Sequence, residues 1–400
     1  MCLCVGSVTA YPQSGAALPE LQTKRLLNSL QIVVAPTPQA EGRLAIGLVV
    51  RYGSAFDGEG KTGLAHLLSR MLQKAATDQT EQGIGKALAD LGATLEIRSD
   101  WDGFQFLLEG NSATFERSLL LLYQVVCEAQ FPEEALASVK QEVLHQLEQG
   151  PDSRTRLRDM FEIVLFGGTT YGRPIQGTPD TVRPMTPGDL KYFYNRHFSP
   201  DAAALVVTGD VDPAEVLAKA ARIWGLWIRM DPIPFTFAPS REPSEDIHLI
   251  EDDPGSSAVE FIFGNLSPRR QDPVFSDVMV ATHILRQRLR KLLPTSLLTV
   301  GLDGRRMPGA VYVQGQSAAD EAIDQILAIQ ESMETMKTAP VLASELAAAQ
   351  NGLIGEFNGR LGTTGGFCRI LLDMEMYRLG SYYATAFPDR IRSCDADAVR

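Results

Sequence analysis

This 400-residue sequence is short of cysteine, of basic charge and of long apolar runs, and each shortage excludes a class of protein. Its five cysteines share no metal-binding spacing beyond a Cys2-x-Cys4 pair, so no disulfide framework is implied. Acidic residues outnumber basic residues by 49 to 37, and a net charge of −12 argues against nucleic acid or an anionic membrane surface as the main partner. The longest apolar runs, such as SLLLLYQVVC, have the length of a core helix, so no membrane span is predicted.

The first ten residues, MCLCVGSVTA, end in Val8-Thr9-Ala10, a small-residue pattern typical of a signal-peptidase site. They have no basic region in front and are too short to be a whole signal. Two interpretations remain open: an ordinary frayed N-terminus, or the end of an export signal whose start is missing. We favour the second, which predicts a periplasmic or otherwise exported protein, with a cytoplasmic location as the alternative. Residues 1–20 are assigned to an N-terminal tail.

Apolar periodicity divides residues 21–230 into the strands and helices of one domain. Residues 43–51 form an apolar run typical of a strand, and an amphipathic helix follows it. Residues 93–110 alternate as two antiparallel strands around the hairpin dipeptide Asp102-Gly103. Two long helices are expected next, and the domain closes with a helix, a buried strand at 203–211 and a further helix.

The segment DPIPFTFAPSREPSE, residues 231–245, contains four prolines and no periodicity, so it is predicted to be a linker. After it, residues 246–400 repeat the order of strands, helix, strands and helices, which indicates a diverged duplication. We therefore expect an α+β protein of two homologous domains, each a mostly antiparallel sheet with helices packed on one face. The second copy stops at Arg400, where its last helix would begin, so we expect either a fragment or a natural end without the final strand.

The stretch GEGKTGLAHLLSRMLQKA, residues 58–75, contains Gly60-Lys61-Thr62, which is the end of a phosphate-binding loop motif. The first glycine of that motif is replaced by Ala55, and the region that follows indicates antiparallel strands instead of βαβ alternation. The glycines are therefore interpreted as a turn at the start of a helix, and no nucleotide site is predicted.

The same stretch resembles part of a known family. GLAHLLSRML resembles the G-[LI]-A-H-x-x-E-H-[ML] helix of the pitrilysin/insulinase family of inverted-motif zinc metallopeptidases, which includes processing peptidases. The likeness extends over YGRPIQGTPDTVRPMTPGDLKYFYNRHFSPDAAALVVTGDV in the first half and DDPGSSAVEFIFGNLSPRRQDPVF in the second. The resemblance implies a clam-like pair of domains facing a chamber, with zinc held by two histidines of this helix and a glutamate of a later one.

At the zinc motif the sequence departs from the family. His66 is kept, but Ser69 stands where a glutamate would act as general base, and Arg70 stands where the second histidine would bind zinc. A hydroxyl has no useful basicity near neutral pH, and a guanidinium has no lone pair to give a metal. We therefore expect no catalytic residue, no bound zinc and no other cofactor, and we favour a packing role for His66.

The family's third zinc ligand falls on Glu142, within VKQEV, when the V-x-x-E-[IL] pattern sets the register. An alignment anchored on the later PDS would put Val143 there instead. A solvated carboxylate on a helix face is an equal alternative for Glu142. An arginine at position 70 could also pair with Glu142 and replace the metal by an ion pair.

Two further segments resemble substrate-contacting parts of the family. Leu289-Arg290-Lys291 resembles its L-R-E motif and suggests Arg290 as a substrate contact, whereas Leu298 stands where a tyrosine is expected. A solvated basic helix face is the alternative for Arg290. The segment ATLEIRSD resembles the edge strand that pairs with substrate, although Glu96 replaces the usual asparagine. Its candidate contacts are Thr94, Leu95, Glu96 and Ile97.

The resemblance and its departures together predict a catalytically inactive zinc-peptidase homologue. Its expected role is that of a non-catalytic subunit whose partner is a sister peptidase chain with the intact zinc motif, the two chains enclosing an extended peptide substrate. Two alternatives stay open. One is an active metallopeptidase with altered ligands, and the other is a free-standing structural or binding subunit of a larger complex.

Overall fold

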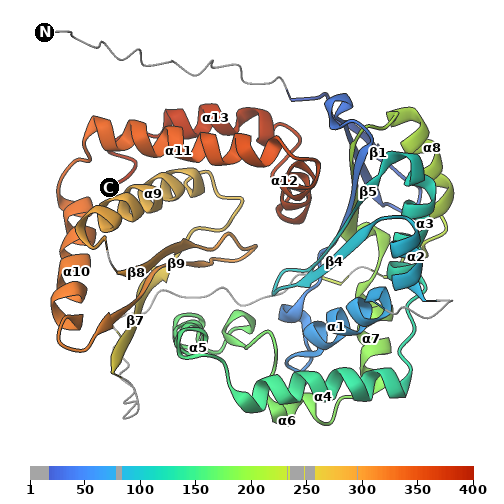
Figure 1. Cartoon of the computed structure of the whole chain (residues 1–400), viewed down its shortest axis with the longest axis horizontal. Helices are drawn as coiled ribbons and strands as arrows, with labels where there is room; N and C mark the ends of the chain where they lie inside the picture. The colour runs from blue at the N-terminus through green and yellow to red at the C-terminus, as the bar shows by residue number, and fades with distance from the viewer. Residues whose placement is uncertain (1–17, 78–82, 232, 235–246, 248–256, 295) are drawn as a thin grey trace, which may run out of the picture.

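Figure 1 shows a computed structural model of the chain, which describes residues 18–77, 83–231, 233–234, 247, 257–294 and 296–400. The strands of the first half are β1 (Gln22–Arg25), β2 (Gln31–Pro36), β3 (Arg43–Val50), β4 (Thr94–Ser99), β5 (Phe104–Asn111) and β6 (Ala203–Gly209). Its helices are α1 (Leu64–Thr77), α2 (Ile84–Asp90), α3 (Phe115–Cys127), α4 (Glu133–Gln149), α5 (Ser153–Phe166), α6 (Pro179–Val182), α7 (Pro187–His197) and α8 (Pro213–Trp224).

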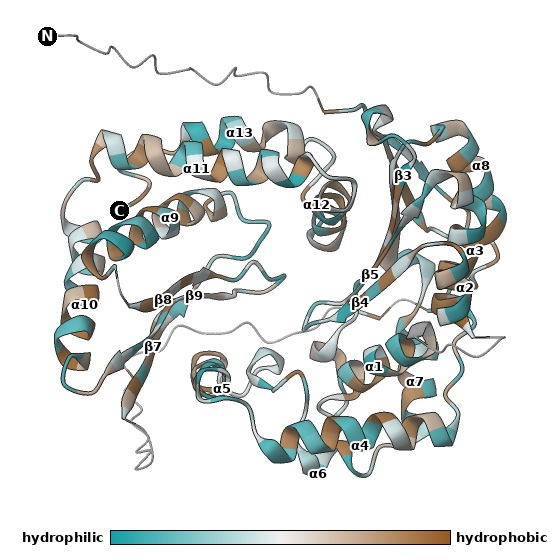
Figure 2. Ribbon diagram, viewed as in Figure 1, coloured by the Kyte–Doolittle hydropathy of each residue, from teal (hydrophilic) through white to brown (hydrophobic). Residues whose placement is uncertain are grey.

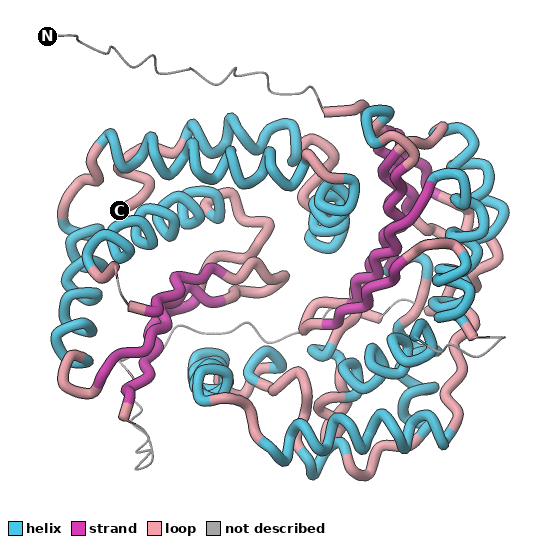
Figure 3. Tube along the Cα trace, viewed as in Figure 1, coloured by secondary structure: helices cyan, strands magenta, loops and turns pink. Residues whose placement is uncertain are grey.

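The strands of the second half are β7 (Ala258–Leu266), β8 (Leu297–Leu302) and β9 (Ala310–Ala318). Its helices are α9 (Phe275–Leu292), α10 (Ala322–Thr338), α11 (Ala343–Leu361), α12 (Thr364–Tyr377) and α13 (Tyr383–Ser393). Each half has one sheet with helices beside it, so the predicted α+β class with two domains is confirmed (Figure 3). The predicted linker and tail fall for the most part outside the described residues. No helix of the described residues has the length and apolar character needed to cross a bilayer.

The sheet of the first half has six strands in the order β1-β2-β6-β3-β5-β4. All neighbouring pairs are antiparallel except β2 and β6. The predicted hairpin forms β4 and β5, and the backbone N–H of Asp100 donates to Gly103 O at its turn (3.0 Å). Strand β6 is buried along its whole length because layers of side chains cover both faces of the sheet. Strands β1 and β4 are the two edges of the sheet, and β4 is the edge beside α1.

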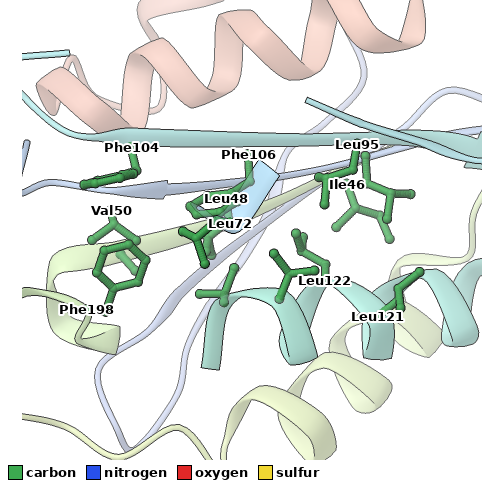
Figure 4. Packing of buried hydrophobic residues seen from close by; sticks show 14 of the residues in the cluster. Ile46, Leu48, Val50, Leu72, Leu95, Phe104, Phe106, Leu121, Leu122 and Phe198 are labelled. Carbon is green, nitrogen blue, oxygen red and sulfur yellow. The ribbon is translucent and has the colours of Figure 1, made fainter. Parts of the chain in front are cut away.

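Helices of the first half cover one face of this sheet. Ile46 and Leu48 of β3 belong to the same buried cluster as Leu72 of α1 and Leu122 of α3, and Figure 4 shows these side chains packed between strand and helix. Their alternation along β3 follows from the two-residue period of a strand. Complete burial of each such side chain contributes about 1.5–3 kcal/mol, so this cluster fixes where α1 lies under the sheet.

The opposite face of the same sheet is covered by α12, which comes from the second half (Figure 1). Cys368, Leu371 and Leu372 of α12 join Ala45 of β3 in a second buried cluster. A Cβ added at Gly47 would lie 2.7 Å from Leu372 Cδ1, so the helix approaches β3 more closely than a side chain at position 47 would allow. Figure 2 shows the apolar character of α12 and of the central strands, in contrast to the largely polar β4.

The three-stranded sheet of the second half, in the order β7-β9-β8, has α9 and α10 on one face. Its other face meets α5 from the first half. Gln314 Nε2 of β9 donates to Arg154 O of α5 (2.7 Å), and the Arg158 guanidinium lies 3.7 Å above the ring of Tyr312. Each sheet is therefore completed by a helix from the other half, α12 on the first sheet and α5 on the second. We call this arrangement the helix exchange.

A loop between β8 and β9, residues 303–309, extends from the second half into the first and is called the clasp loop. The side chain of Arg305 is 7% exposed and pairs with Glu162 of α5 (2.8 Å) and with Asp303 (2.9 Å). Its guanidinium also lies 3.8 Å above the ring of Trp101, at the β4–β5 turn. The buried cation is thus held by residues of both halves.

Backbone groups of the clasp loop make further contacts with the same turn. The Arg306 N–H donates to Asp102 Oδ2 (2.9 Å), and the Met307 N–H donates to the Tyr171 hydroxyl (3.2 Å). That hydroxyl in turn donates to Asp102 Oδ1. Asp102 is 2% exposed, so the turn that the sequence marks as a hairpin also receives the second half.

We predict that Arg305→Met lowers the free energy of unfolding by about 3 kcal/mol, because it leaves the buried carboxylate of Glu162 without one of its cations. Urea denaturation followed by tryptophan fluorescence measures the change. Arg183→Met is the matched control, since the ion pair between Arg183 and Glu148 is exposed on both sides and its loss should cost about 0.5 kcal/mol or less. Equal losses in the two variants would contradict a clasp role for Arg305.

Candidate functional site

The GEGKT segment fixes the start of α1. Asp57 is 4% exposed and accepts hydrogen bonds from the backbone N–H groups of Gly63 (2.8 Å) and Ala65 (2.9 Å), which lie at the first turn of the helix. Burial raises the pKa of Asp57 to about 7, although these hydrogen bonds favour the ionised form. Lys61 forms an ion pair with Asp189 of α7 (3.0 Å). The segment therefore serves as the start of a helix, and its lysine is bound to a neighbouring carboxylate.

His66, which the motif keeps, and Ser69, which departs from the motif, lie one turn apart on α1. Burial, with a smaller contribution from the charge of Arg70, lowers the pKa of His66 to about 4, so the imidazole is neutral at pH 7. Ser69 is 5% exposed, and its hydroxyl donates to His66 O (2.8 Å). The hydroxyl of Ser99, at the end of β4, donates to Ser69 Oγ (3.1 Å). Ser69 thus connects the helix to the edge strand.

Arg70 extends from α1 toward α4, where it meets the glutamate that the sequence suggested as its partner. Arg70 Nη2 lies 3.6 Å from Glu142 Oε2, and Lys74 Nζ lies 3.6 Å from Glu142 Oε1. All three side chains are partly exposed. The alternative register is disfavoured, because Val143 is 2% exposed and packs in the core below α1.

These residues do not fit a zinc ion. Zinc takes neutral imidazole and anionic carboxylate or thiolate ligands, usually four including water. Here a guanidinium and an ammonium occupy both oxygens of the carboxylate at the third ligand position. Within the described part of the chain, no group of three His, Cys, Asp or Glu side chains is arranged to hold a metal. The site offers one neutral imidazole and an ion-paired carboxylate.

The free edge of β4 faces α1, and its backbone groups are partly occupied. The hydrogen bond between Asp100 and Gly103 fixes which residues of β4 are hydrogen-bonded to β5, because such residues alternate along an antiparallel pair. The backbone N–H and C=O groups of Leu95 and Ile97 therefore point away from β5. The side-chain amide of Gln73 on α1 takes two of them: Nε2 donates to Leu95 O (3.4 Å), and Oε1 accepts from the Ile97 N–H (3.2 Å). A side chain of the chain itself therefore lies where an added strand would pair.

Glu96, the residue that replaces the expected asparagine, points to the other half. Its carboxylate lies 2.5 Å from Arg369 Nη2 of α12 and also pairs with Arg98 on its own strand. The ion pair between Glu96 and Arg369 thus connects the edge strand β4 to helix α12 of the second half. Of the four candidate contacts on β4, Thr94 is exposed, Leu95 is buried, and Glu96 and Ile97 are half-buried.

Arg290 lies at the C-terminal end of α9, in the opposite half of the molecule from α1 (Figure 1). Its neighbours on the helix are bound: Arg286 Nη2 donates to Val300 O (2.8 Å), and Arg288 forms an ion pair with Glu345 (2.8 Å). Arg290 is exposed, and no ion pair includes it among the described residues. The chain therefore does not bring Arg290 to its own α1 site.

Two residues of this site, Gln73 and Lys74, were not predicted from the sequence. Lys74 is four residues after Arg70, so helical spacing alone places both cations on one face, toward the same carboxylate. Nothing comparable marks Gln73. A polar residue beside an apolar stripe is typical of a solvated helix surface, and its two backbone contacts arise only when α1 is packed beside β4.

Comparison with known proteins places both halves in one family of sequences. Residues 32–179 match the family model described as Insulinase (Peptidase family M16), and residues 184–353 match the one described as Peptidase M16 inactive domain. An "Uncharacterized zinc protease" of Rickettsia bellii is 24% identical over 201 residues, which are 50% of this chain and 48% of that protein. "Cytochrome b-c1 complex subunit 1, mitochondrial" of Bos taurus is 20% identical over 213 residues, 53% of this chain and 44% of that protein.

The chain spans about half the length of these curated relatives. Among solved structures, the peptidase M16 inactive domain from Pseudomonas fluorescens superposes with a TM-score of 0.85 at 21% identity, covering 95% of this chain and 93% of that one. At this level of identity the likeness establishes the fold.

We predict that Arg70→His gives the chain the capacity to bind about one zinc ion, whereas the wild-type chain binds none stoichiometrically. The substitution removes one of the two cations paired with Glu142 and adds a second imidazole one turn from His66, with Glu142 as the third ligand. Zinc content after dialysis, measured by mass spectrometry, tests the prediction.

The control adds Glu142→Gln to Arg70→His, which removes the anionic ligand and keeps the size of the side chain. Zinc should then fall well below one per chain. Equal zinc in the two variants would exclude Glu142 from the vestigial site, and no zinc in either would mean that α1 and α4 do not form one.

Proposed function

Because the chain belongs to the insulinase (peptidase M16) family, we propose that it is a catalytically inactive member that acts as the non-catalytic partner of an active sister chain. The observation that carries the proposal is the ion pair between Arg70 and Glu142, which occupies the place of two zinc ligands. Ser69, at the position of the general base, is buried and hydrogen-bonded to the helix backbone. A serine there cannot accept a proton from water near neutral pH.

The framework around the altered site supports a partner role. Each half has its own sheet, and the β4 edge of the first sheet lies beside α1. A strand edge of this kind can add an extended peptide through main-chain hydrogen bonds. The proposal assigns this edge to a peptide held jointly with the sister chain, once the Gln73 amide turns away from Leu95 and Ile97.

In the second half of the chain, the proposal assigns a role to Arg290. It is an exposed cation at the end of α9, away from the α1 site of its own chain. We assign it to the peptide in the sister chain's site, where a guanidinium can bind a carbonyl or a carboxylate. The proposal includes an exported location, on the small-residue pattern Val8-Thr9-Ala10.

A structural subunit of a larger assembly is the second candidate function. The likeness to subunit 1 of the cytochrome b-c1 complex favours it, because that relative carries a name that describes a subunit of a complex. The two candidates differ in one respect that can be measured. A peptidase partner copurifies with zinc-dependent proteolysis, whereas a structural subunit copurifies without it.

We predict that the full chain, tagged and recovered from its native source, brings down a homologous chain with an intact H-x-x-E-H motif. The complex should contain zinc and cleave peptides, and both properties should be lost with a chelator. The chain purified alone should do neither. One zinc per isolated chain together with proteolysis would contradict the proposal, and a stable complex without proteolysis would favour the structural subunit.

We also predict that Gln73→Ala strengthens the binding of an extended peptide by about three- to tenfold. The change frees two edge groups, and at about 0.5 kcal/mol for each net hydrogen bond the gain is about 1 kcal/mol, somewhat less than the 1.4 kcal/mol of a tenfold change in affinity. Fluorescence anisotropy of a labelled valine- and threonine-rich decapeptide measures it. Gln149→Ala, at the exposed end of α4, is the control and should leave affinity unchanged. Unchanged or weaker binding by Gln73→Ala would mean that peptides do not pair with this edge.

A further inference from the structure

A cavity of about 180 Å³ lies where the two halves and α12 meet, away from the α1 site. Arg51 at the end of β3 belongs to the first half, Gln271 and Arg306 belong to loops of the second, and α12 ends beside them. The lining consists of Arg51, Gln271, Arg306, Met376, Tyr377 and Arg378. Three arginines and a glutamine thus line one space, and no aspartate or glutamate is among the described residues that line it.

The buried side of this cavity carries the positive charge of Arg51, which neighbouring negative charge compensates only in part. Arg51 is 6% exposed, and its Nη2 pairs with Glu375 (3.2 Å) while its Nε donates to Glu375 O (2.9 Å). Burial lowers the pKa of Arg51 to about 10, and the nearby charges of Arg378 and Arg306 act in the same direction against the effect of Glu375. The guanidinium remains charged at pH 7, close to two like charges.

The other two arginines are held in different ways. Arg306 Nη1 and Nη2 donate to the carbonyl oxygens of Arg51 (3.2 Å) and Asp102 (3.1 Å), which orients the guanidinium at the clasp loop. Arg378 follows the last residue of α12, has a left-handed φ of +53° and is exposed. It forms no ion pair with the described residues. The cavity therefore has an ordered inner wall and an exposed arginine at its rim.

We propose that this cavity binds a small oxyanion, a phosphate or a carboxylate group, between Arg51, Arg306 and Arg378. Guanidinium groups bind such oxygens through paired N–H donors, and convergent arginines are the usual protein device for them. Gln271 adds a side chain that can donate, and the buried Met376 and Tyr377 line the inner side of the space. A space of this size holds one tetrahedral anion or a short carboxylate with a few waters.

Binding there would join the two halves. Arg51 follows β3 of the first sheet, Arg306 belongs to the clasp loop and Arg378 follows the exchanged helix α12, so one anion would contact cations from three separate elements. Like charges brought together by folding destabilise the folded chain, and a bound anion offsets that repulsion. The ligand should therefore stabilise the contact between the halves as well as occupy the cavity.

The test uses isothermal titration calorimetry and thermal unfolding of the full chain at constant ionic strength. Inorganic phosphate is one probe; N-acetylglycine, with N-acetylglycinamide as its uncharged counterpart, is the other. We expect saturable binding of phosphate or of N-acetylglycine, no binding of the amide, and a rise in Tm with the anion that binds. The anion that binds identifies the source of the oxygens.

Arg378→Asn removes the rim cation while keeping a residue that tolerates the left-handed conformation, so the end of α12 should stay folded. We expect at least tenfold weaker anion binding and loss of the rise in Tm. Arg117→Gln, which removes an exposed arginine of α3, should change neither more than twofold. Failure of both anions to bind the wild-type chain, or equal binding by Arg378→Asn, would overturn the proposal.

Discussion

The helix exchange is the constraint on which the rest of the structure depends. Neither sheet buries both faces with helices of its own half: α12 covers the first sheet and α5 covers the second. The close approach of α12 to Gly47 makes the first of these contacts specific, because the strand has no side chain at that point. Since an uncovered apolar sheet face is costly in water, the two halves fold as mutually dependent units even though the sequence order repeats.

The exchange also sets the position of the candidate site. Arg369 reaches from α12 to Glu96 on the β4 edge, and the clasp loop binds the turn that joins β4 to β5. The edge strand is therefore held from the second half at its middle and at its end. The clasp loop also brings Arg306 beside Arg51 and the end of α12, around the cavity at the junction. Site and cavity are both consequences of how the halves are joined.

The sequence predicts features that depend on neighbouring residues well, and it predicts the helix exchange between the two halves poorly. The hairpin at Asp102-Gly103 and the start of α1 can be identified because their causes lie within a few neighbouring residues, and Ser69 and Arg70 stand out because the family resemblance supplies the motif from which they depart. The helix exchange cannot be identified from the sequence, because the apolar stripe of α12 shows that one face of the helix is buried but not which sheet buries it. Gln73 is missed for the same reason: its partners on β4 are distant in the sequence and appear only when α1 packs beside the edge.

The framework around the motif does not depend on a metal, because apolar packing holds its helices. Helices α1 and α4 are held by apolar residues such as Leu68 and Val143, which are buried whatever occupies the motif. The ion pair between Arg70 and Glu142 is partly exposed and contributes little to stability by itself. It compensates the charge of the Glu142 carboxylate, while the fold and the strand edge rest on the apolar packing.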